Sequence, residues 1–178
     1  MLKLRGESVY LRALEPEDSE IIYKWENNTD VWQVSDTLVP FSRYTIDQYV
    51  NSIQDIYVNK QLRLVICEND TSAVIGTLDV FDFNPFHSRA GIGILIADNK
   101  HRKKGFASQA LSLAIDYCFT VLMLNQIYCN IPVENEDSLN LFLRYDFQIV
   151  GIMKNWNKTL NGFADEYFLQ LLNYHLDT

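Results

Sequence analysis

Short runs of hydrophobic residues, separated by polar and turn-forming residues, divide the chain into segments with strand or helix periodicity. Residues 8–14 alternate between apolar and polar positions, which is typical of a strand with one buried face. Three later runs are rich in β-branched and aromatic residues and predict three consecutive strands, at 62–68, 73–83 and 90–97. Further strands are predicted at 125–133, 147–156 and 165–172.

Four segments between these runs have helical patterns. The first, 15–28, has Pro16 at an early position and acidic residues in its first turn, with Glu15 or a neighbouring residue as the cap. In 43–59, apolar residues recur at helical spacing and predict one amphipathic helix. Residues 106–122 form the clearest helical stretch, and 135–145 form the last one.

The order of these elements is strand, two helices, three strands, helix, strand, helix and two strands. It predicts an α/β fold with a mixed central sheet of about seven strands flanked by about four helices. Helical crossovers make the centre of such a sheet parallel. Because no repeat, low-complexity tract or linker interrupts the pattern, residues 1–178 are expected to form one domain.

The composition is ordinary for a soluble globular protein, with 48% hydrophobic and 21% charged residues. The N-terminal segment lacks the pattern of a signal peptide, and the apolar runs are too short to span a bilayer, so we expect no membrane association. Cys67, Cys118 and Cys129 lie in apolar segments without metal-ligand spacing. They predict reduced thiols, no metal site and a cytoplasmic protein. The formal net charge of −8 argues against nonspecific nucleic-acid binding and favours a cationic partner.

One basic segment departs from this acidic balance. Of the 15 Lys and Arg residues, four fall between Lys100 and Lys104, directly before Gly105 and the clearest helix. A helix N-terminus attracts anions, because its first N–H groups have no internal partner and the helix dipole is positive there. Gly105 has no Cβ and would let a phosphate approach the backbone. On charge alone, a solvated charge run before an ordinary helix is the simpler interpretation.

Two other phosphate-binding patterns fit this segment poorly. The Walker pattern needs an earlier glycine and a Gly-Lys-Ser/Thr ending, which "NKHRKKGFAS" lacks. A dinucleotide-binding pattern needs Gly-x-Gly-x-x-Gly after a strand, whereas Gly91 and Gly93 lie inside a predicted strand.

The segment "RKKGFA" (102–107) instead matches the Arg/Gln-x-x-Gly-x-Gly/Ala signature of the Gcn5-related N-acetyltransferase (GNAT) family. The surrounding order also resembles that family: "RAGIGILI" its fourth strand, "FASQALSLAIDYCFTVL" its long helix and "VENEDSLNLFLRYDF" its Asn-x-x-Ser/Ala helix. The likeness covers nearly the whole chain. It is nearest to the branch of spermidine/spermine and ribosomal-protein N-terminal acetyltransferases, which "YLRALEPED" also resembles.

The resemblance implies an acyltransferase that uses acetyl-CoA and no metal. It implies that the fourth and fifth strands splay apart and that the fourth strand binds the pantetheine arm. The pyrophosphate would bind the loop and the helix start, and Asn135 would contact the pantetheine, act as a helix N-cap, or do both. The expected cofactor-binding residues are Ile94, Leu95, Ile96, Arg102, Lys103, Lys104, Gly105, Phe106, Ala107 and Asn135.

The chain departs from the family pattern at positions that carry chemistry. Phe142 stands where many relatives have a tyrosine that protonates the departing thiolate, and phenylalanine has no proton to give. Tyr145, one turn later, aligns with a core position but is a candidate substitute. Asp146 replaces the closing glycine of the helix motif, and Gly91 replaces a frequent glutamate.

These losses predict a slower enzyme rather than an inactive one. A thiol has a pKa of about 8.5, so a thiolate is an acceptable leaving group near neutral pH. A general acid or base contributes about 10²–10⁴ in rate. Asp79 and Asp82 are candidate replacement bases, although both also fit as surface carboxylates at a strand end.

An acidic and aromatic stretch between residues 13 and 41 faces the acceptor in the family that the chain resembles. Its acids outnumber its bases, and Glu26, Trp32 and Asp36 are the expected acceptor-binding residues. An acidic and aromatic surface of this kind attracts amines through Coulomb and cation–π interactions, although an acidic solvated helix face explains the same residues.

A small-molecule amine resembling a polyamine is the favoured acceptor, with a protein N-terminus or an aminoglycoside as alternatives. A rival of another class is a CoA-binding module that has lost catalysis. The sequence leaves the oligomeric state open, including a homo-oligomer.

Overall fold

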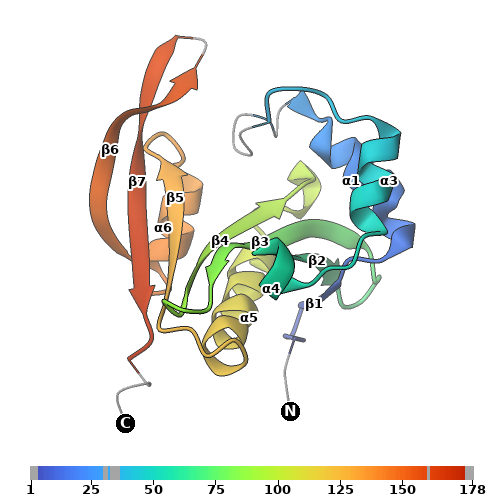
Figure 1. The fold of residues 1–178 in the computed structure, drawn as a ribbon, viewed down its shortest axis with the longest axis horizontal. Coiled ribbons are helices and arrows are strands. Elements are labelled where there is room, and N and C mark those ends of the chain that lie inside the picture. The colour runs from blue at the N-terminus through green and yellow to red at the C-terminus, as the bar shows by residue number, and fades with distance from the viewer. Residues whose placement is uncertain (1–3, 30–31, 33–36, 160, 175–178) are drawn as a thin grey trace.

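The computed structural model describes residues 4–29, 32, 37–159 and 161–174. Its strands are β1 (Val9–Ala13), β2 (Leu62–Glu68), β3 (Val74–Asn84), β4 (Arg89–Ile96), β5 (Gln126–Pro132), β6 (Gln148–Thr159) and β7 (Gly162–Leu172). They form one seven-stranded sheet in the order β1-β2-β3-β4-β5-β7-β6 (Figure 1). The β4–β5 pair is parallel, and every other neighbouring pair is antiparallel. The predicted α/β class with a mixed sheet is therefore confirmed.

The helices are α1 (Ser19–Glu26), α3 (Arg43–Val50), α4 (Ile56–Asn59), α5 (Phe106–Thr120) and α6 (Glu136–Leu143). A 3-10 turn, Pro16–Asp18, precedes α1, and Glu15 is its N-cap. The long helix α5 is the crossover between the parallel strands β4 and β5, as parallel pairing requires. Among the described residues, no helix has the length and apolar character needed to cross a membrane.

The prediction of one helix over 43–59 was wrong, because local capping divides that segment in two. Helix α3 ends at Val50, and the Asn51 amide donates to the Asp47 carbonyl at 2.8 Å. The Asp55 carboxylate then accepts from the N–H groups of Tyr57 and Val58 and starts α4. Asn and Asp hydrogen-bond to nearby backbone in this way, and they end or begin helices even where apolar residues keep helical spacing.

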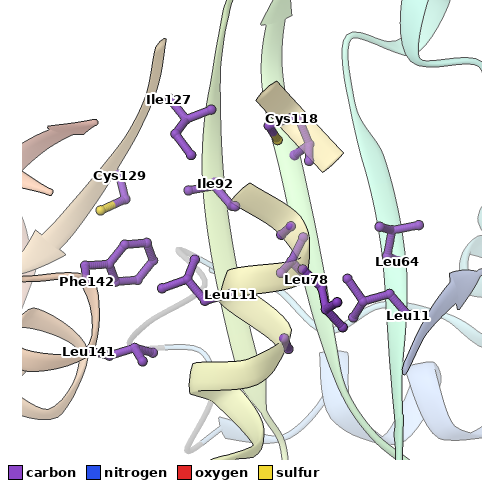
Figure 2. Packing of buried hydrophobic residues seen from close by; sticks show 14 of the residues in the cluster. Leu11, Leu64, Leu78, Ile92, Leu111, Cys118, Ile127, Cys129, Leu141 and Phe142 are labelled. Atoms are coloured by element: carbon purple, nitrogen blue, oxygen red, sulfur yellow. The ribbon is translucent and has the colours of Figure 1, made fainter. Parts of the chain in front are cut away.

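Two apolar clusters cover the two faces of the sheet. The larger cluster joins β4, β5, α5 and α6, and Figure 2 shows Ile92, Leu111 and Phe142 within it. Burial of a side chain such as Leu111, which is fully buried, contributes about 2 kcal/mol to folding. The smaller cluster packs α1 and α3 against β2 on the other face, through Ile22 and Val65 among others. The helices α1 and α3 therefore cover the β1–β2 side of that second face.

Strands β4 and β5 separate after a short paired segment. They pair only from Arg89–Gln126 to Gly91–Tyr128. Beyond this point β4 still pairs with β3 up to Ile96, and β5 still pairs with β7 up to Pro132. No described strand pairs with the edges of β4 and β5 that face each other across the gap, which Figure 1 shows as a wedge. The predicted splay is confirmed.

Candidate active site

A cleft with a volume of about 900 Å³ follows this wedge. Strands β4 and β5 form its walls, the N-terminus of α5 and one face of α6 close one end, and α1, β2 and β3 contribute the other. The cleft brings together residues that are far apart in sequence and that the sequence analysis assigned to cofactor, acceptor and catalysis. These are Glu26, Asp79, Ile94, Leu95, Ile96, Arg102, Lys103, Gly105, Ala107, Asn135 and Phe142.

The start of α5 leaves its first backbone N–H groups without a partner in the described part of the chain. Gly105 is its N-cap with φ of +82°, a left-handed conformation that favours glycine, and a Cβ there would meet no atom within 4 Å. The N–H of Gln109 is the first to find a backbone acceptor, the Gly105 carbonyl. No group in the described part of the chain accepts from the N–H groups of residues 103–108. These unpaired donors and the helix dipole suit a phosphate.

The basic side chains around this turn divide into two groups. Arg102 and Lys103 line the cleft, where Arg102 Nε donates to the Ile96 carbonyl at 3.1 Å and Lys103 Nζ lies 3.7 Å from Asp137. Lys104 is exposed and does not line the cleft in the described structure. Phe106, which was also expected to bind the cofactor, is buried in the core and does not line the cleft either. The geometry therefore favours backbone donors over the lysine cluster as the main anion contact.

Helix α6 places Asn135 and Phe142 on the cleft. Asn135 is the N-cap, and its Oδ1 accepts from the Ser138 N–H at 3.2 Å. Phe142 is 3% exposed and packs edge-to-face on Phe147, with ring centres 5.0 Å apart. Asp146, which replaces the closing glycine of the family motif, has φ of +63°, a left-handed conformation that Asp tolerates better than most residues.

Tyr145 is tied to α5 instead of pointing at the cleft. Its hydroxyl donates to the Ser108 carbonyl at 2.6 Å and lies 2.9 Å from Ser108 Oγ. Tyr145 is not among the described residues that line the cleft. The hydroxyl therefore holds the end of α6 against the start of α5.

The Phe81 ring occupies the space beside Gly91, a contact that the sequence did not predict. A Cβ at Gly91 would lie 2.2 Å from Cε2 of Phe81, so the Phe81 ring fills the space that a glutamate would need. Phe81 also packs edge-to-face on Tyr128, with ring centres 5.8 Å apart. An aromatic surface therefore replaces a carboxylate beside the point where β4 and β5 separate.

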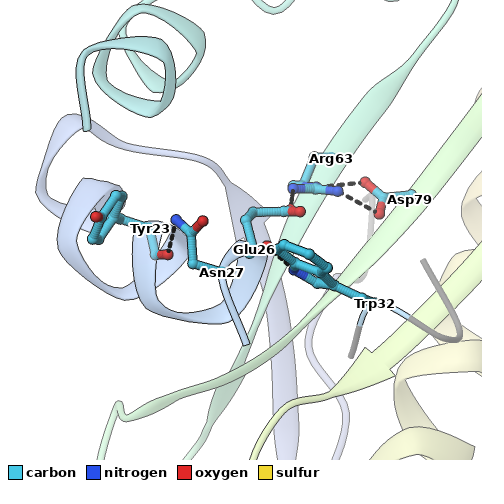
Figure 3. Close-up of polar contacts among 6 residues, drawn as sticks. All are labelled: Tyr23, Glu26, Asn27, Trp32, Arg63 and Asp79. Atoms are coloured by element: carbon cyan, nitrogen blue, oxygen red, sulfur yellow. Dashed lines mark hydrogen bonds and ion pairs between the residues drawn. The ribbon is translucent and has the colours of Figure 1, made fainter. Parts of the chain in front are cut away.

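The other end of the cleft carries an ion-pair network in which Arg63 contacts both Asp79 and Glu26 (Figure 3). Arg63 on β2 forks onto Asp79 on β3, with Nε–Oδ1 at 2.7 Å and Nη2–Oδ2 at 3.0 Å. Its Nη1 donates to the carboxylate of Glu26 at the end of α1. Burial lowers the pKa of the Arg63 guanidinium, but Asp79 and Glu26 outweigh burial, so the net shift is upward. Burial also raises the pKa of the neighbouring Tyr49 phenol.

This network changes how the two candidate bases are placed. Both carboxylate oxygens of Asp79 accept from Arg63, which leaves Asp79 poorly suited to take a proton. Asp82 lies in a separate depression with Lys60 and Phe86 and accepts from the Tyr128 hydroxyl at 3.0 Å. Burial and this bond to Asp82 raise the pKa of Tyr128 to about 12.

The expected acceptor-binding residues are only partly brought together. Glu26 lines the cleft, and the Trp32 indole N–H donates to the Glu26 carbonyl at 2.7 Å, which caps the end of α1. Asp36 lies outside the described residues. Arg63 was not among the residues predicted from the sequence, although a charged residue inside the apolar strand "LRLVICE" was a signal for a buried partner.

Comparison with known proteins agrees with this geometry. Residues 8–148 match the family model of the acetyltransferase (GNAT) domain. The chain belongs to the GNAT family of N-acetyltransferases. An uncharacterized N-acetyltransferase of Bacillus licheniformis, p20, is 31% identical over 174 residues, which covers 97% of each chain.

Other GNAT relatives are named for spermidine as their substrate. Spermidine N(1)-acetyltransferase of Escherichia coli K12 is 31% identical over 150 residues, which covers 81% of this chain and 75% of that one. The crystal structure of spermidine N-acetyltransferase from Vibrio cholerae in complex with CoA and spermine superposes with a TM-score of 0.83 at 27% identity. The superposition covers 92% of this chain and 95% of the Vibrio cholerae chain.

The ion pair in this GNAT cleft generates a stability prediction. Arg63→Met would leave two poorly hydrated carboxylates without a cation, so the free energy of unfolding at pH 7 should fall by about 3 kcal/mol. Urea unfolding at pH 7 measures this loss.

The matched control is Arg43→Met, because Arg43 pairs with Glu20 at 2.7 Å but both side chains are more than half exposed. An exposed pair contributes about 0–1 kcal/mol, so this variant should unfold nearly like the native protein. Equal losses in the two variants would show that the Arg63 network is not a buried ion pair.

Proposed function

We propose that this N-acetyltransferase moves the acetyl group of acetyl-CoA to a primary amine of a polyamine-like cation. The observation that carries the proposal is the single cleft with unpaired backbone donors at one end and carboxylates at the other. An anionic, elongated donor molecule fits the first end, and a cationic acceptor fits the second.

The fit of CoA rests on groups that have no partner within the described chain. The N–H groups of residues 103–108 would bind the pyrophosphate, with Gly105 allowing close approach. Apart from the Ile96 carbonyl, which accepts from Arg102, the edge of Ile94–Ile96 that faces away from β3 offers backbone groups to the amides of the pantetheine arm. Asn135 lies beside that path. The CoA complex of the Vibrio cholerae relative supports this assignment.

A cationic acceptor is supported by charge and by the relatives. Glu26 and Asp79 carry two negative charges and Arg63 one positive charge, so this end of the cleft keeps an excess of one negative charge. The whole chain has a formal net charge of −8. Relatives named for spermidine, and the spermine complex, support a polyamine over a protein N-terminus or an aminoglycoside. The dodecameric Vibrio cholerae structure supports a homo-oligomer for this chain as well.

The chemistry is direct transfer between two molecules held side by side. The neutral amine nitrogen attacks the thioester carbonyl carbon, a C–N bond forms, the C–S bond breaks, and the proton of the amine passes to solvent. Phe142 cannot protonate the departing sulfur, so the thiol leaves as a thiolate with a pKa of about 8.5. Proximity remains the main contribution to the rate.

A thiol-release assay with acetyl-CoA and a panel of amines tests this function. Spermidine and spermine should be acetylated with higher kcat/KM than a monoamine, a peptide with a free N-terminus or an aminoglycoside. KM for spermidine should rise with salt, because screening acts over about 10 Å at 0.1 M ionic strength. Better turnover of a neutral or acidic acceptor would contradict the proposal. Tight acetyl-CoA binding with no turnover of any amine would favour the binding-module alternative.

The absence of the tyrosine predicts the shape of the pH profile. An acceptor amine with a pKa near 10.4 is about 1 part in 10³ neutral at pH 7, so kcat/KM should rise with pH to a plateau. No descending limb is expected near pH 10, because Phe142 has no proton to lose. Phe142→Tyr should raise kcat by up to about 10² and introduce a descending limb.

Tyr145→Phe is the control for this profile. The Tyr145 hydroxyl is bound to Ser108, so its removal should leave the shape of the pH profile unchanged. A native profile that falls at high pH, with the fall abolished in Tyr145→Phe, would show that Tyr145 is the acid.

A further inference from the structure

Glu166 on β7 is a buried carboxylate without a cationic partner. It is 7% exposed, and no Lys, Arg or His nitrogen of the described residues lies within 4.0 Å of it. Its contacts are two neutral amides, Asn157 Nδ2 at 3.0 Å and Asn130 Nδ2 at 3.4 Å. Among the described residues, the other acids that are buried or line the cleft all have a basic partner: Asp18, Glu26, Asp79 and Asp137. Burying an unpaired carboxylate is unfavourable for folding, so a role outside stability is expected.

Asn130 connects this carboxylate to the cleft. Along β5 the residues Ile127, Cys129 and Ile131 point into the core, so Asn130 lies on the opposite face, where it is exposed and lines the cleft. It is two residues beyond Tyr128, the last residue of β5 that pairs with β4. Pro132 is the ladder partner of Glu166, which places Glu166 diagonally across from Asn130 on the neighbouring strand.

The carboxylate fixes which end of the Asn130 amide reaches the cleft. An ionised carboxylate only accepts hydrogen bonds, so Asn130 must turn its NH₂ group toward Glu166. Its carbonyl oxygen Oδ1 then points away, and no described residue donates to it. Asn157 on β6 donates to the other oxygen of the Glu166 carboxylate. It follows an irregular segment of β6, which Asp165 on β7 holds by accepting from Lys154 and from the Asn155 N–H.

We propose that Asn130 Oδ1 accepts a hydrogen bond from an N–H of the amine acceptor, and that Glu166 is the positioning residue that keeps this oxygen facing the cleft. The ligand class is a primary amine or ammonium, since such a group donates N–H. A group that only accepts hydrogen bonds is not recognised at this point. The inference deepens the proposed function and rests on it.

The test exchanges the polarity of the pair and measures amine binding directly. Glu166→Gln should keep its oxygen on the closer donor, Asn157, and present its NH₂ to Asn130. The Asn130 amide must then turn over and present N–H groups to the cleft. Titration of the CoA-saturated protein with spermidine should show an affinity about 10- to 100-fold lower, the range of a hydrogen bond to a charged group. Asn130→Leu should cause a similar loss, and KM for acetyl-CoA should stay unchanged in both variants.

The double variant Asn130→Asp with Glu166→Gln provides the rescue. The introduced amide at position 166 would donate to the introduced carboxylate at position 130, whose second oxygen again faces the cleft. Spermidine affinity should therefore return to within about threefold of the native value. The matched control is Glu7→Gln, because Glu7 is exposed and outside the cleft, and it should bind spermidine normally. Circular dichroism checks the fold of each variant.

Native affinity in both single variants would overturn the inference while leaving the proposed function intact. Loss in both single variants without rescue in the double variant would also overturn it, since that result indicates a structural role. If the native protein neither binds nor acetylates any amine, the proposed function fails first, and the inference fails with it.

Discussion

The separation of β4 from β5 is the constraint on which the rest of the structure depends. Parallel pairing holds the two strands together only as far as Gly91 and Tyr128, and each strand keeps its other neighbour beyond that point. A sheet interior with unpaired backbone edges is unfavourable unless something pairs with them. The cleft, the unpaired donors at the start of α5 and the face of α6 all lie around this separation. A ligand with amide groups along its length is the natural partner for such edges.

Charge is distributed unevenly along the cleft. The end at α5 offers positive partial charge from backbone groups, because the lysines nearby are exposed or paired with acids. The far end holds Glu26 and Asp79, but Arg63 neutralises half of their charge and fixes their orientation. In the proposed function, attraction for an amine at this end would therefore come from a partly neutralised network. Asn130 lines the cleft from β5, and its side-chain NH₂ donates to the buried carboxylate of Glu166.

Local sequence signals predicted the elements well and the cross-strand contacts poorly. The pattern around "RKKGFA" predicted a glycine-led helix start because its determinants, a glycine and the first helical residues, are neighbours in sequence. The break between α3 and α4 was missed because Asn51 and Asp55 act through caps that apolar spacing does not reveal. Phe81 filling the space at Gly91, Arg63 forking onto Asp79 and Asn130 meeting Glu166 depend on strand register. Sequence alone does not specify this register between distant strands.

Amide hydrogen exchange with and without CoA tests the central claim most directly, because it reports on the backbone groups assigned to the ligand. Addition of CoA should slow exchange at residues 103–108 and along 94–96, while the amides of β1 and β2 remain unchanged. Tight CoA binding with no change in exchange at residues 103–108 would contradict the account.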